Sequence, residues 1–519
     1  MESLFAAVNA FFEFLVPITN FLWEYPTHEA SWATIPVLGR LSLVMLMLLG
    51  AGLFFTLKTR FVQLRYFTRG VHIMLHKKSS SAGISPLAAF LLSSAMRIGP
   101  GNIMGVTGAI SVGGPGALFW MWVSALLGMA TAFTEAVLAQ LYKRKEHGSY
   151  VGGLPFYGQA LLNNRAWVGI SLSLIFIVYA LFSIPGQTFH LFTALGAMTE
   201  ALNGTHYERS STLYQGIALL LILCVAVSVW GGLRRVSKIT DIMVPIMAGL
   251  YTLIVLCLIL LNVDLLPHFF KEVFHGAFSP HALFGGAIGH ALVQGVKRGL
   301  MSNEAGQGTI TMAAAVSEND HPCEQGFIQA IGVFLDTMII CTMTGFVVVM
   351  AQLWAPDSGV DWNSIQASKI TVFLSSVRHL IPFPALHTAA TVTMALCYAL
   401  FAFTTLVGLI LFAEIAANRI SSQRFFLQSI RAAGAFFFVP FGALSVLAGL
   451  ELGNLWVISD FVNVMVVIAN LPLLMLGAKH VFLALEHYQN NEGVRFISDE
   501  IGLETEVWVK PSTISDRAV

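Results

Sequence analysis

Residues 93–103 read SSAMRIGPGNI, and residues 296–308 read VKRGLMSNEAGQG. Each run interrupts an apolar stretch that is long enough to cross a bilayer, and each stands at the start of one half of the chain. A broken helix leaves backbone N–H and C=O groups without partners, which lipid does not tolerate. Such helices persist where the freed groups bind an ion or a polar solute in a cavity, so the pair indicates a carrier.

The composition is that of a polytopic membrane protein. Of 519 residues, 56% are hydrophobic and 11% are charged, whereas a soluble domain carries about 25% charged residues. The formal net charge is zero, so no nucleic acid or other polyanion is expected as a partner. The apolar N-terminus lacks the basic region and the cleavage site of a signal peptide, so residues 1–35 are expected to form an interfacial segment.

Hydropathy and helix breakers predict an all-α fold with about eleven transmembrane helices. The expected spans are Pro36–Leu57, Ile84–Val112, Pro115–Tyr142, Val168–Phe192, Gln215–Trp230, Ile239–Val263, Ala282–Val316, Gly326–Leu353, Thr388–Ala417, Ala433–Leu450 and Leu455–Leu485. The first is an extra helix, and the others form two sets of about five. An odd number of helices per set makes the second set run oppositely through the membrane, which is the geometry of an inverted repeat.

This pattern divides the chain into five parts. They are the interfacial segment 1–35, the extra helix and basic cytoplasmic loop 36–83, the first five-helix repeat 84–263, the second repeat 264–485 and a cytoplasmic tail 486–519. With the N-terminus outside, 20 of the 28 Lys and Arg residues fall in inner regions, 5 in outer regions and 3 within spans. The excess of inner positive charge predicts an outer N-terminus and a cytoplasmic C-terminus in the plasma (inner) membrane.

The first break is rich in residues that release backbone groups. Pro100 lacks an N–H, and the glycines beside it allow non-helical dihedral angles. The carbonyls near Ser94, Arg97 and Ile98 are then expected to be free for a cation, and the N–H groups beyond Gly101 to face a carboxylate at a half-helix N-terminus. The alternative is that small residues four apart form a helix-packing face, and both interpretations can hold together.

The second break concentrates polar residues in an otherwise apolar span. They are Lys297, Arg298, Ser302, Asn303, Glu304, Gly306, Gln307 and Gly308. Charges at membrane depth cost several kcal/mol unless they are paired or hydrated. The run is therefore either a loop between helices or an unwound helix that lines a polar cavity, and the apolar residues on both sides of it favour the cavity.

Further acids within or near the ends of predicted spans include Glu135, Asp336 and Glu414. Each is interpreted as a structural ion pair or a carbonyl-bonded side chain, with a role in coupling as the less favoured alternative. The expected partners are Arg97, Lys297 and Arg298.

Hydroxyl and amide side chains complete the candidate set. Thr404 and Thr405 are adjacent on one span, and their oxygens are hard ligands of the kind that Na⁺ prefers. The alternative for each is a hydrogen bond to a carbonyl of its own helix. Gln187 follows a Pro-Gly pair, where its amide could contact a substrate or cap a broken helix.

Several of these stretches resemble the alanine/glycine:cation symporter family, whose members are sodium:alanine symporters. The stretches are 99–103, 113–122, 125–131 with Glu135, 295–306, 332–337 and 401–404. The resemblance covers about Gly50 to Lys479. It implies a LeuT-like core of two inverted five-helix repeats behind one extra helix, and Na⁺- or H⁺-coupled uptake of alanine or glycine.

The resemblance also implies roles for individual residues. The residues expected to bind the substrate are Gly99, Gly101, Asn102, Gln187, Ser302, Asn303, Glu304 and Thr404. The residues expected to bind sodium are Ile98, through its carbonyl, and Thr404 and Thr405, through their hydroxyls.

The sequence departs from the family pattern at three places. Pro100 stands where the family often has a small polar residue, and 308–310 read GTI in place of a Gly-Ser-Ala-like run. Leu409 and Ile410 follow a glycine after which many members place Trp or Asn and then aromatic residues. The third departure falls beside the expected pocket, so it bears on the identity of the substrate.

The sequence thus predicts a secondary active transporter, namely a sodium-coupled symporter of a small neutral amino acid that works by alternating access. The alternatives are a proton-coupled carrier of another small zwitterion and, less favoured, an ion channel. No ATP-binding motif and no paired catalytic motif occurs, so no enzymatic activity, catalytic residue or organic cofactor is expected. The expected partners are the coupling sodium ion, the amino acid and the lipid bilayer.

Overall fold

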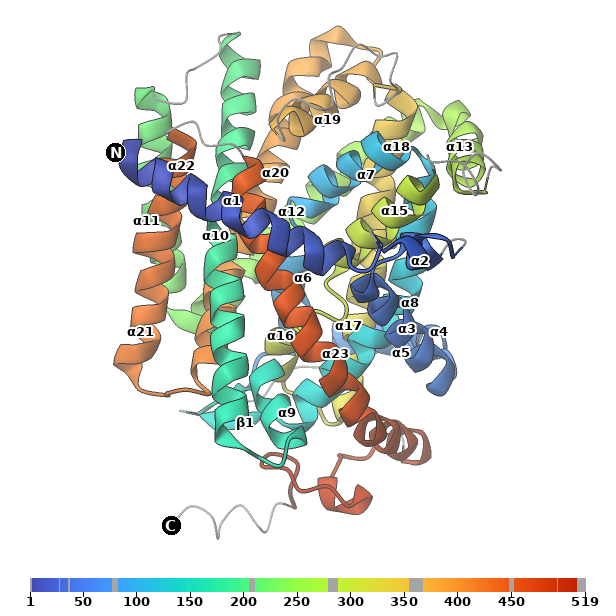
Figure 1. The fold of residues 1–519 in the computed structure, drawn as a ribbon, viewed down its shortest axis with the longest axis vertical. Coiled ribbons are helices and arrows are strands. Elements are labelled where there is room, and N and C mark those ends of the chain that lie inside the picture. The colour runs from blue at the N-terminus through green and yellow to red at the C-terminus, as the bar shows by residue number, and fades with distance from the viewer. Residues whose placement is uncertain are drawn as a thin grey trace.

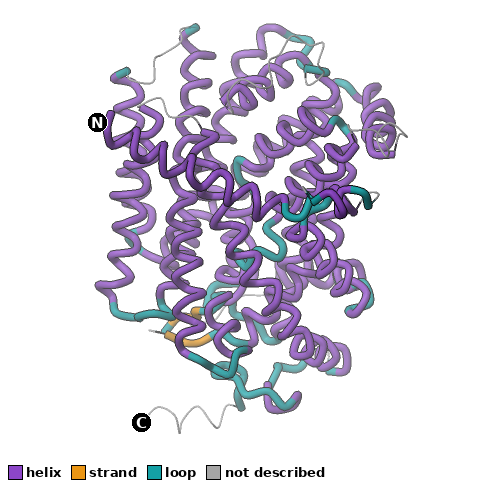
Figure 2. Tube along the Cα trace, viewed as in Figure 1, coloured by secondary structure: helices purple, strands orange, loops and turns teal. Residues whose placement is uncertain are grey.

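A computed structural model describes residues 2–27, 29–35, 38–76, 83–146, 148–204, 211–278, 288–353, 367–447, 452–491 and 493–510. Helices dominate it, as Figure 1 shows, and Figure 2 shows that strands are confined to one small hairpin in the described part of the chain. The hairpin pairs β1 (Arg144–Glu146) with β2 (Ser149–Val151) in antiparallel register. The helical fold class is therefore as predicted.

Among the described residues, eight helices are long and apolar enough to cross a membrane, by length and composition. They are α8 (Gly116–Leu141), α10 (Ala166–Asn203), α11 (Thr212–Val229), α12 (Gly232–Leu261), α17 to α18 (Pro322–Ala351), η6 with α20 (Pro384–Ala417), α21 to α22 (Arg424–Leu447) and Ser459–Asn490 of α23 (Leu452–Asn490). Each overlaps one of the expected spans. The protein is thus an integral, multi-pass membrane protein.

The three other expected spans are shorter helices. The extra span is α3 (Leu43–Lys58), an apolar helix of 16 residues. The span expected at 84–112 is divided into α6 (Pro86–Arg97) and α7 (Val106–Gly113), separated by a non-helical segment and a π-helical turn. The span expected at 282–316 is divided into α15 (Ile288–Asn303) and α16 (Thr311–Ala315), and residues 279–287 lie outside the described part. Both predicted breaks are therefore confirmed.

Further helices connect or flank these spans. They are α1 (Glu2–Glu24), α2 (Ala30–Ala33), α4 (Val62–Arg65), α5 (Phe67–His76), α9 (Leu154–Leu161), α13 (Leu266–Phe278), α19 (Ala367–His379) and the short η1 (Leu38–Arg40), η3 (Val263–Leu265) and η8 (Ser498–Ile501). The segment expected as an interfacial N-terminus forms α1, which crosses α23 obliquely in Figure 1. The region expected as a basic loop contains α4 and α5, with 77–82 outside the described residues. The boundaries of the five predicted parts stay a prediction.

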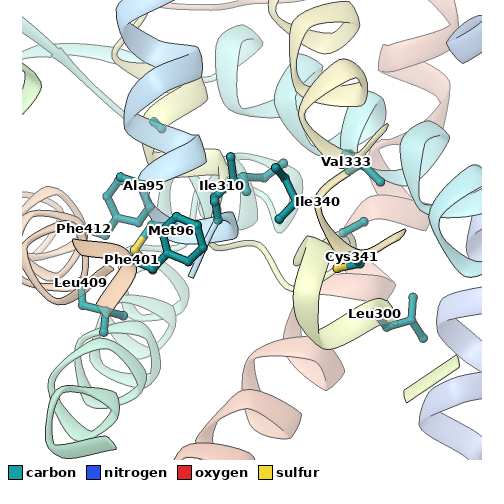
Figure 3. Packing of buried hydrophobic residues seen from close by; sticks show 14 of the residues in the cluster. Ala95, Met96, Leu300, Ile310, Val333, Ile340, Cys341, Phe401, Leu409 and Phe412 are labelled. Carbon is teal, nitrogen blue, oxygen red and sulfur yellow. The ribbon is translucent and has the colours of Figure 1, made fainter. Parts of the chain in front are cut away.

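Small residues let the second broken helix approach α8 closely. A Cβ atom at Gly295 would lie 2.3 Å from the carbonyl oxygen of Ala117, and one at Gly299 would lie 2.2 Å from the hydroxyl of Ser124. Side chains larger than hydrogen would force the two helices apart, which is the usual reason for glycine at helix contacts in membranes. Figure 3 shows apolar side chains around the breaks, among them Met96, Leu300 and Phe401.

Candidate functional site

The two breaks open onto one cavity of about 260 Å³. Its wall carries two cationic side chains, Arg97 and Arg298, and two acidic ones, Glu304 and Asp460. The same wall includes the backbone of Gly101 and the amide of Gln187, whose buried Oε1 has no hydrogen-bond partner within the described residues. Polar groups of both signs in an apolar bundle suit a small zwitterion rather than an apolar ligand.

At the first break, more backbone C=O groups accept hydrogen bonds from nearby N–H groups than the sequence suggested. The carbonyl of Ser94 accepts the N–H of Ile98 at 2.8 Å, and the carbonyl of Arg97 accepts the N–H of Gly99 at 2.9 Å. The expectation that these two carbonyls are free is therefore wrong, because the chain turns tightly before Pro100 and closes local hydrogen bonds. The carbonyl of Ile98 and the N–H of Gly101 have no hydrogen-bond partner among the described residues.

The buried side chain of Asn102 stabilises the shape of this break by hydrogen bonds. Its Oδ1 accepts the N–H of Gly99 at 2.9 Å, and its Nδ2 donates to Oδ1 of Asp336 at 2.6 Å. Asn102 is fully buried and does not line the cavity. Its amide therefore acts on the break and on η4 (Phe334–Cys341) at the same time.

Asp336 joins the first break to the second. Besides Asn102, its carboxylate accepts the hydroxyl of Ser302 at 2.9 Å and that of Thr337 at 2.8 Å. Ser302 lies in the last turn of α15 and lines the cavity. Among the described residues three neutral donors surround this buried carboxylate and no close ion pair reaches it, while Arg97, one of the expected partners, acts on it through its charge from a longer distance. The carboxylate thus ties three helical segments together.

The second break begins at Glu304, which leaves the helix in a left-handed conformation with φ of 57°. A non-glycine residue rarely adopts this conformation, and it persists where the surroundings impose it. The carboxylate of Glu304 accepts the hydroxyl of Thr309 at 2.7 Å, and the side chain lines the cavity. Asn303, just before it, is fully buried and accepts the N–H of Ala305 at 3.1 Å.

Glu135 of α8 contacts the second break without lining the cavity. Its carboxylate accepts the N–H of Gly306 at 3.1 Å, the N–H of Gly308 at 2.8 Å and Nδ2 of Asn470 at 2.6 Å. Tyr157 donates to Asn470 in turn. Here too, the direct contacts of the carboxylate among the described residues are with backbone and amide N–H groups, and the expected partner Arg97 acts on it only through charge at longer range. The carboxylate supplies acceptors for donors that the missing helical turn would otherwise leave unsatisfied.

Arg97 bridges the two breaks directly. Its Nε donates to the carbonyl of Asn303 at 3.2 Å, and its Nη1 donates to Oε1 of Gln329 at 2.9 Å. Nη2 is buried without a hydrogen-bond partner among the described residues. A Cβ atom at Gly332 would lie 1.9 Å from Nη1, so glycine at that position is what admits the guanidinium.

The adjacent threonines of α20 face different ways. Thr405 lines the cavity, and its hydroxyl donates to the carbonyls of Ala95 at 3.1 Å and Phe401 at 2.9 Å. Thr404 does not line it, and its hydroxyl lies 3.1 Å from two carbonyls of its own helix and 3.4 Å from Sδ of Met247. The structure therefore brings Thr405, rather than Thr404, next to the first break.

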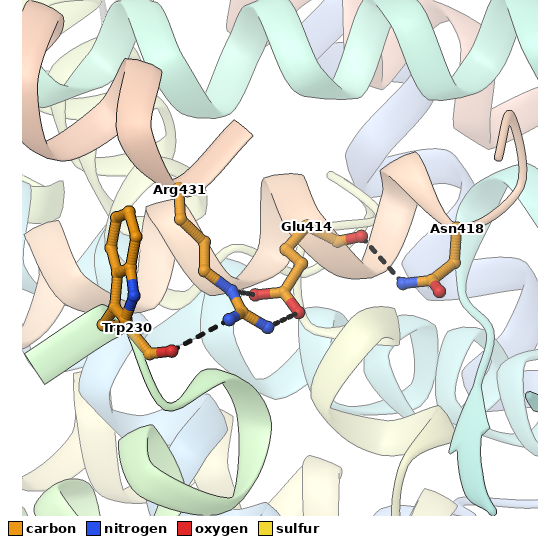
Figure 4. A network of polar contacts seen from close by, with 4 residues as sticks. All are labelled: Trp230, Glu414, Asn418 and Arg431. Atoms are coloured by element: carbon orange, nitrogen blue, oxygen red, sulfur yellow. Dashed lines mark hydrogen bonds and ion pairs between the residues drawn. The ribbon is translucent and has the colours of Figure 1, made fainter. Parts of the chain in front are cut away.

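Glu414 takes no part in the site. Figure 4 shows its carboxylate held by Arg431 through two nitrogen–oxygen contacts of 2.7 and 2.5 Å. Arg431 also donates to the carbonyl of Trp230 at 2.9 Å. The partner is thus a residue of α21 rather than any of the three expected cations, and the pair joins α20, α21 and the end of α11.

Six of the ten predicted site residues line the cavity, whose wall has 21 residues. The predicted residues that line the cavity are Gly99, Gly101, Gln187, Ser302, Glu304 and Thr405. The predicted residues Ile98, Asn102, Asn303 and Thr404 lie outside its wall. Sequence reasoning missed Ser183 of α10 and Asp460 and Asn463 of α23, which also line it. Asp460 could have been found, because it is an acid within a predicted span.

The described residues contain no group of three or more His, Cys, Asp or Glu side chains that could hold a metal ion. A cation in this cavity would depend on carbonyl and hydroxyl oxygens, which are ligands suited to a hard ion. The hydroxyl of Thr405 lines the cavity and fits that description, whereas the unpaired carbonyl of Ile98 is an oxygen of the right kind that lies outside the cavity wall.

A family model described as the sodium:alanine symporter family matches residues 31–497. The chain belongs to this family. Since the family consists of transporters, this member of it is a transporter and not an enzyme. Its relatives and its apolar helices together make it a multi-pass carrier for amino acids.

Similar curated proteins agree with this assignment. Amino-acid carrier protein AlsT of Bacillus subtilis is 32% identical over 491 residues, which cover 94% of this symporter-family chain and 95% of AlsT. Sodium/alanine symporter AgcS of Methanococcus maripaludis is 34% identical over 371 residues, covering 70% and 78% of the two chains. Probable sodium/glutamine symporter GlnT of Bacillus subtilis is 32% identical, covering 86% and 87%.

Among solved structures, this symporter-family chain is similar to MhsT in complex with L-phenylalanine. The TM-score is 0.47 at 14% sequence identity, with 78% of this chain and 100% of that chain covered.

Proposed function

We propose that this member of the family is a sodium-coupled symporter of a small neutral amino acid, alanine or glycine, that works by alternating access. The observation that carries the proposal is the meeting of two broken helices at one cavity of about 260 Å³ with side chains of both charges. Pockets for drug-sized ligands measure about 300–1,000 Å³, so the volume favours a small solute. A zwitterion could place its carboxylate near the cationic groups and its ammonium near the acidic groups of the same cavity.

The substrate is proposed to lie across the two breaks. The free N–H of Gly101 starts a half-helix, which is where a carboxylate is stabilised by the helix dipole. Glu304 offers an acceptor for the ammonium group from the opposite break. Gln187 has an amide oxygen without a partner among the described residues, so it can accept a further ammonium hydrogen. Ser302 adds a hydroxyl, while Asn102 and Asn303 support this arrangement from behind.

Sodium is proposed to bind between the first break and α20. The carbonyl of Ile98 and the hydroxyl of Thr405 are the ligands favoured by the contacts described above. Thr404 stays a candidate ligand, but its hydroxyl does not line the cavity, whereas that of Thr405 does. The proposed topology has eleven transmembrane helices, of which the last ten form two inverted sets of five, with the N-terminus outside and the C-terminus in the cytoplasm.

Counterflow in proteoliposomes tests this proposal directly. Vesicles loaded with unlabelled alanine or glycine are expected to accumulate the labelled amino acid, and an inward sodium gradient is expected to drive net uptake. A proton gradient without sodium serves as the comparison arm. Uptake driven by protons alone would refute sodium coupling, and counterflow of neither amino acid would refute the proposed substrate.

Replacing Thr405 with valine is expected to raise the sodium concentration for half-maximal uptake about tenfold, which corresponds to the loss of one good oxygen ligand. Valine keeps the branched shape and removes only the hydroxyl. Thr404→Val is the matched control, and its effect is expected to be smaller because that hydroxyl does not line the cavity. An equal shift in both variants would argue against the assignment of Thr405 as the principal hydroxyl ligand.

Glu304→Gln is expected to lower the rate of uptake about a hundredfold, because a charged acceptor for the ammonium group becomes a neutral one. Glutamine retains an oxygen for the hydroxyl of Thr309, so the fold should persist. Thermal unfolding in detergent checks that it does. Gln307→Glu changes the charge of the cavity wall at a different position, so it shows whether uptake depends on the position of the carboxylate or only on the total charge of the wall. Wild-type uptake by Glu304→Gln would remove this residue from the substrate site.

A further inference from the structure

The C-terminal strap, residues 493–510, is a folded segment that returns to the body of the protein. Its aromatic residues Phe496 and Trp508 are 1% and 3% exposed. Within the strap, the carbonyl of Trp508 accepts both the N–H of Ser498 at 2.8 Å and its hydroxyl at 3.0 Å. These internal bonds close a loop around η8, so the segment presents its two rings to the body in a fixed arrangement.

The strap docks on the end of α8 and on the loop that follows α16. Nε1 of Trp508 donates to the carbonyl of Gln140 at 2.7 Å, and the N–H of Phe496 donates to the carbonyl of Asp320 at 2.9 Å. At its rim, Glu506 pairs with Arg144 at 3.1 Å. Figure 1 places this end of the chain opposite α7, α15 and α18.

Under the strap lies Lys143, a cation that is only 1% exposed. Its Nζ lies 4.9 Å from the ring centre of Trp508 and 4.1 Å from that of Tyr150, so it is held between two aromatic faces. The same nitrogen donates to Oε1 of Gln140 at 2.8 Å and to the carbonyl of Ser317 at 2.8 Å. Trp508 thus covers the cation that binds the segment after α16.

That segment is where the two broken helices are joined. The N–H of Ile84, just before α6, donates to the carbonyl of Val316 at 3.2 Å, and the N–H of Glu318 donates to the carbonyl of Ile84 at 2.9 Å. Gln140 adds bonds to the carbonyls of Ala314 at 2.5 Å and Ser317 at 3.0 Å. One half of each broken helix is therefore fastened to the other and to α8 at the face covered by the strap.

We infer that the C-terminal strap is a latch that keeps this face of the transporter closed, with Lys143 as its positioning residue. The inference rests on the proposed alternating access, in which α6 and α16 must separate for the cavity to open toward this face. Where α16 moves away from α8 as well as from α6, the carbonyl of Ser317 would leave Lys143 and the site on which Trp508 rests would be disturbed. The strap therefore stabilises the closed state, and its removal would shift the population toward the open one.

Hydrogen–deuterium exchange on the full chain in nanodiscs tests the latch without any transport reaction. In Trp508→Ala, amides of 84–97 and 311–318 are expected to exchange about five- to tenfold faster, the change that follows from losing one hydrogen bond and one cation–π contact. Amides of 288–303 should exchange as in the wild type. Trp508→Phe keeps a ring but removes the N–H donor, so it should give a smaller increase without loss of the fold.

Lys143→Met is the second variant, because it keeps the length of the side chain and removes the charge. It should accelerate exchange in the same two segments. Trp167→Ala, at a tryptophan that is 63% exposed on α10, is the matched control and should change neither. Exchange at 311–318 that is unchanged in Trp508→Ala, Trp508→Phe and Lys143→Met would overturn the latch. Strap-dependent exchange in a protein that fails the counterflow test would instead overturn the proposed function and leave the closed-face contact standing.

Discussion

Replacing Glu135 with alanine is expected to abolish uptake and to destabilise the protein by about 3–5 kcal/mol, the usual cost of removing one member of a buried charged hydrogen-bond set. The carboxylate accepts the N–H groups of Gly306 and Gly308 and the amide of Asn470. Without it, three buried donors lose their acceptor, and the second break loses the group that holds it open. Tryptophan fluorescence during heating in detergent measures the stability, and proteoliposome uptake measures the activity.

Glu135→Gln separates geometry from charge. The glutamine oxygen can keep the two donors that one carboxylate oxygen serves now, Gly308 and Asn470, while its NH₂ group would face the N–H of Gly306, so an intermediate loss of stability is expected. If Glu135→Ala unfolded at the wild-type temperature and transported at the wild-type rate, the carboxylate would not be what maintains the second break.

Replacing Asp336 with asparagine is expected to lower uptake about a hundredfold while leaving the protein folded, because its oxygens position both breaks and the amide cannot accept from all three donors. The amide of Asn102 and the hydroxyls of Ser302 and Thr337 all donate to this carboxylate. The effect should appear in sodium-driven uptake and in counterflow alike, since the cavity itself is misshapen.

Asp241→Asn is the matched control for Asp336→Asn, because Asp241 is an exposed acid in α12. It should transport as the wild type does. Thr337→Val removes one of the three donors, so its loss of uptake should be smaller than that of Asp336→Asn and larger than that of Asp241→Asn. Full activity in Asp336→Asn would show that the two breaks keep their arrangement without this carboxylate.

The sequence predicted the breaks well because their cause is local. Pro100 and the glycines beside it interrupt the helix wherever the rest of the chain lies, and the polar run after Leu300 does the same. The helical fold class followed from the length of the apolar stretches in the same way. These features need no knowledge of what the segments contact.

The partners of the buried acids could not be predicted, because they come from distant parts of the chain. Asn102 and Asp336 are 234 positions apart, and Glu135 and Gly306 are 171 apart. A charge inside a span suggests an opposite charge in direct contact with it, yet here neutral N–H and O–H donors make the direct contacts of both acids, and Arg97 acts on them only from a longer distance. Thr405 faces the cavity and Thr404 does not because of how α20 is rotated about its axis. This rotation could not be predicted, because α20 has apolar residues on nearly all of its sides.

The pairing of Ile84 with residues 316–318 is made by main-chain atoms alone. Any side chain at these positions other than proline can preserve the two hydrogen bonds. Alanine substitutions there should therefore leave the contact unchanged, and related chains can keep it with different side chains. Only a residue that removes the donor exposes it, and proline is the one natural amino acid that does so at position 84. The joint between the two broken helices at this face can therefore be maintained without any characteristic side chain.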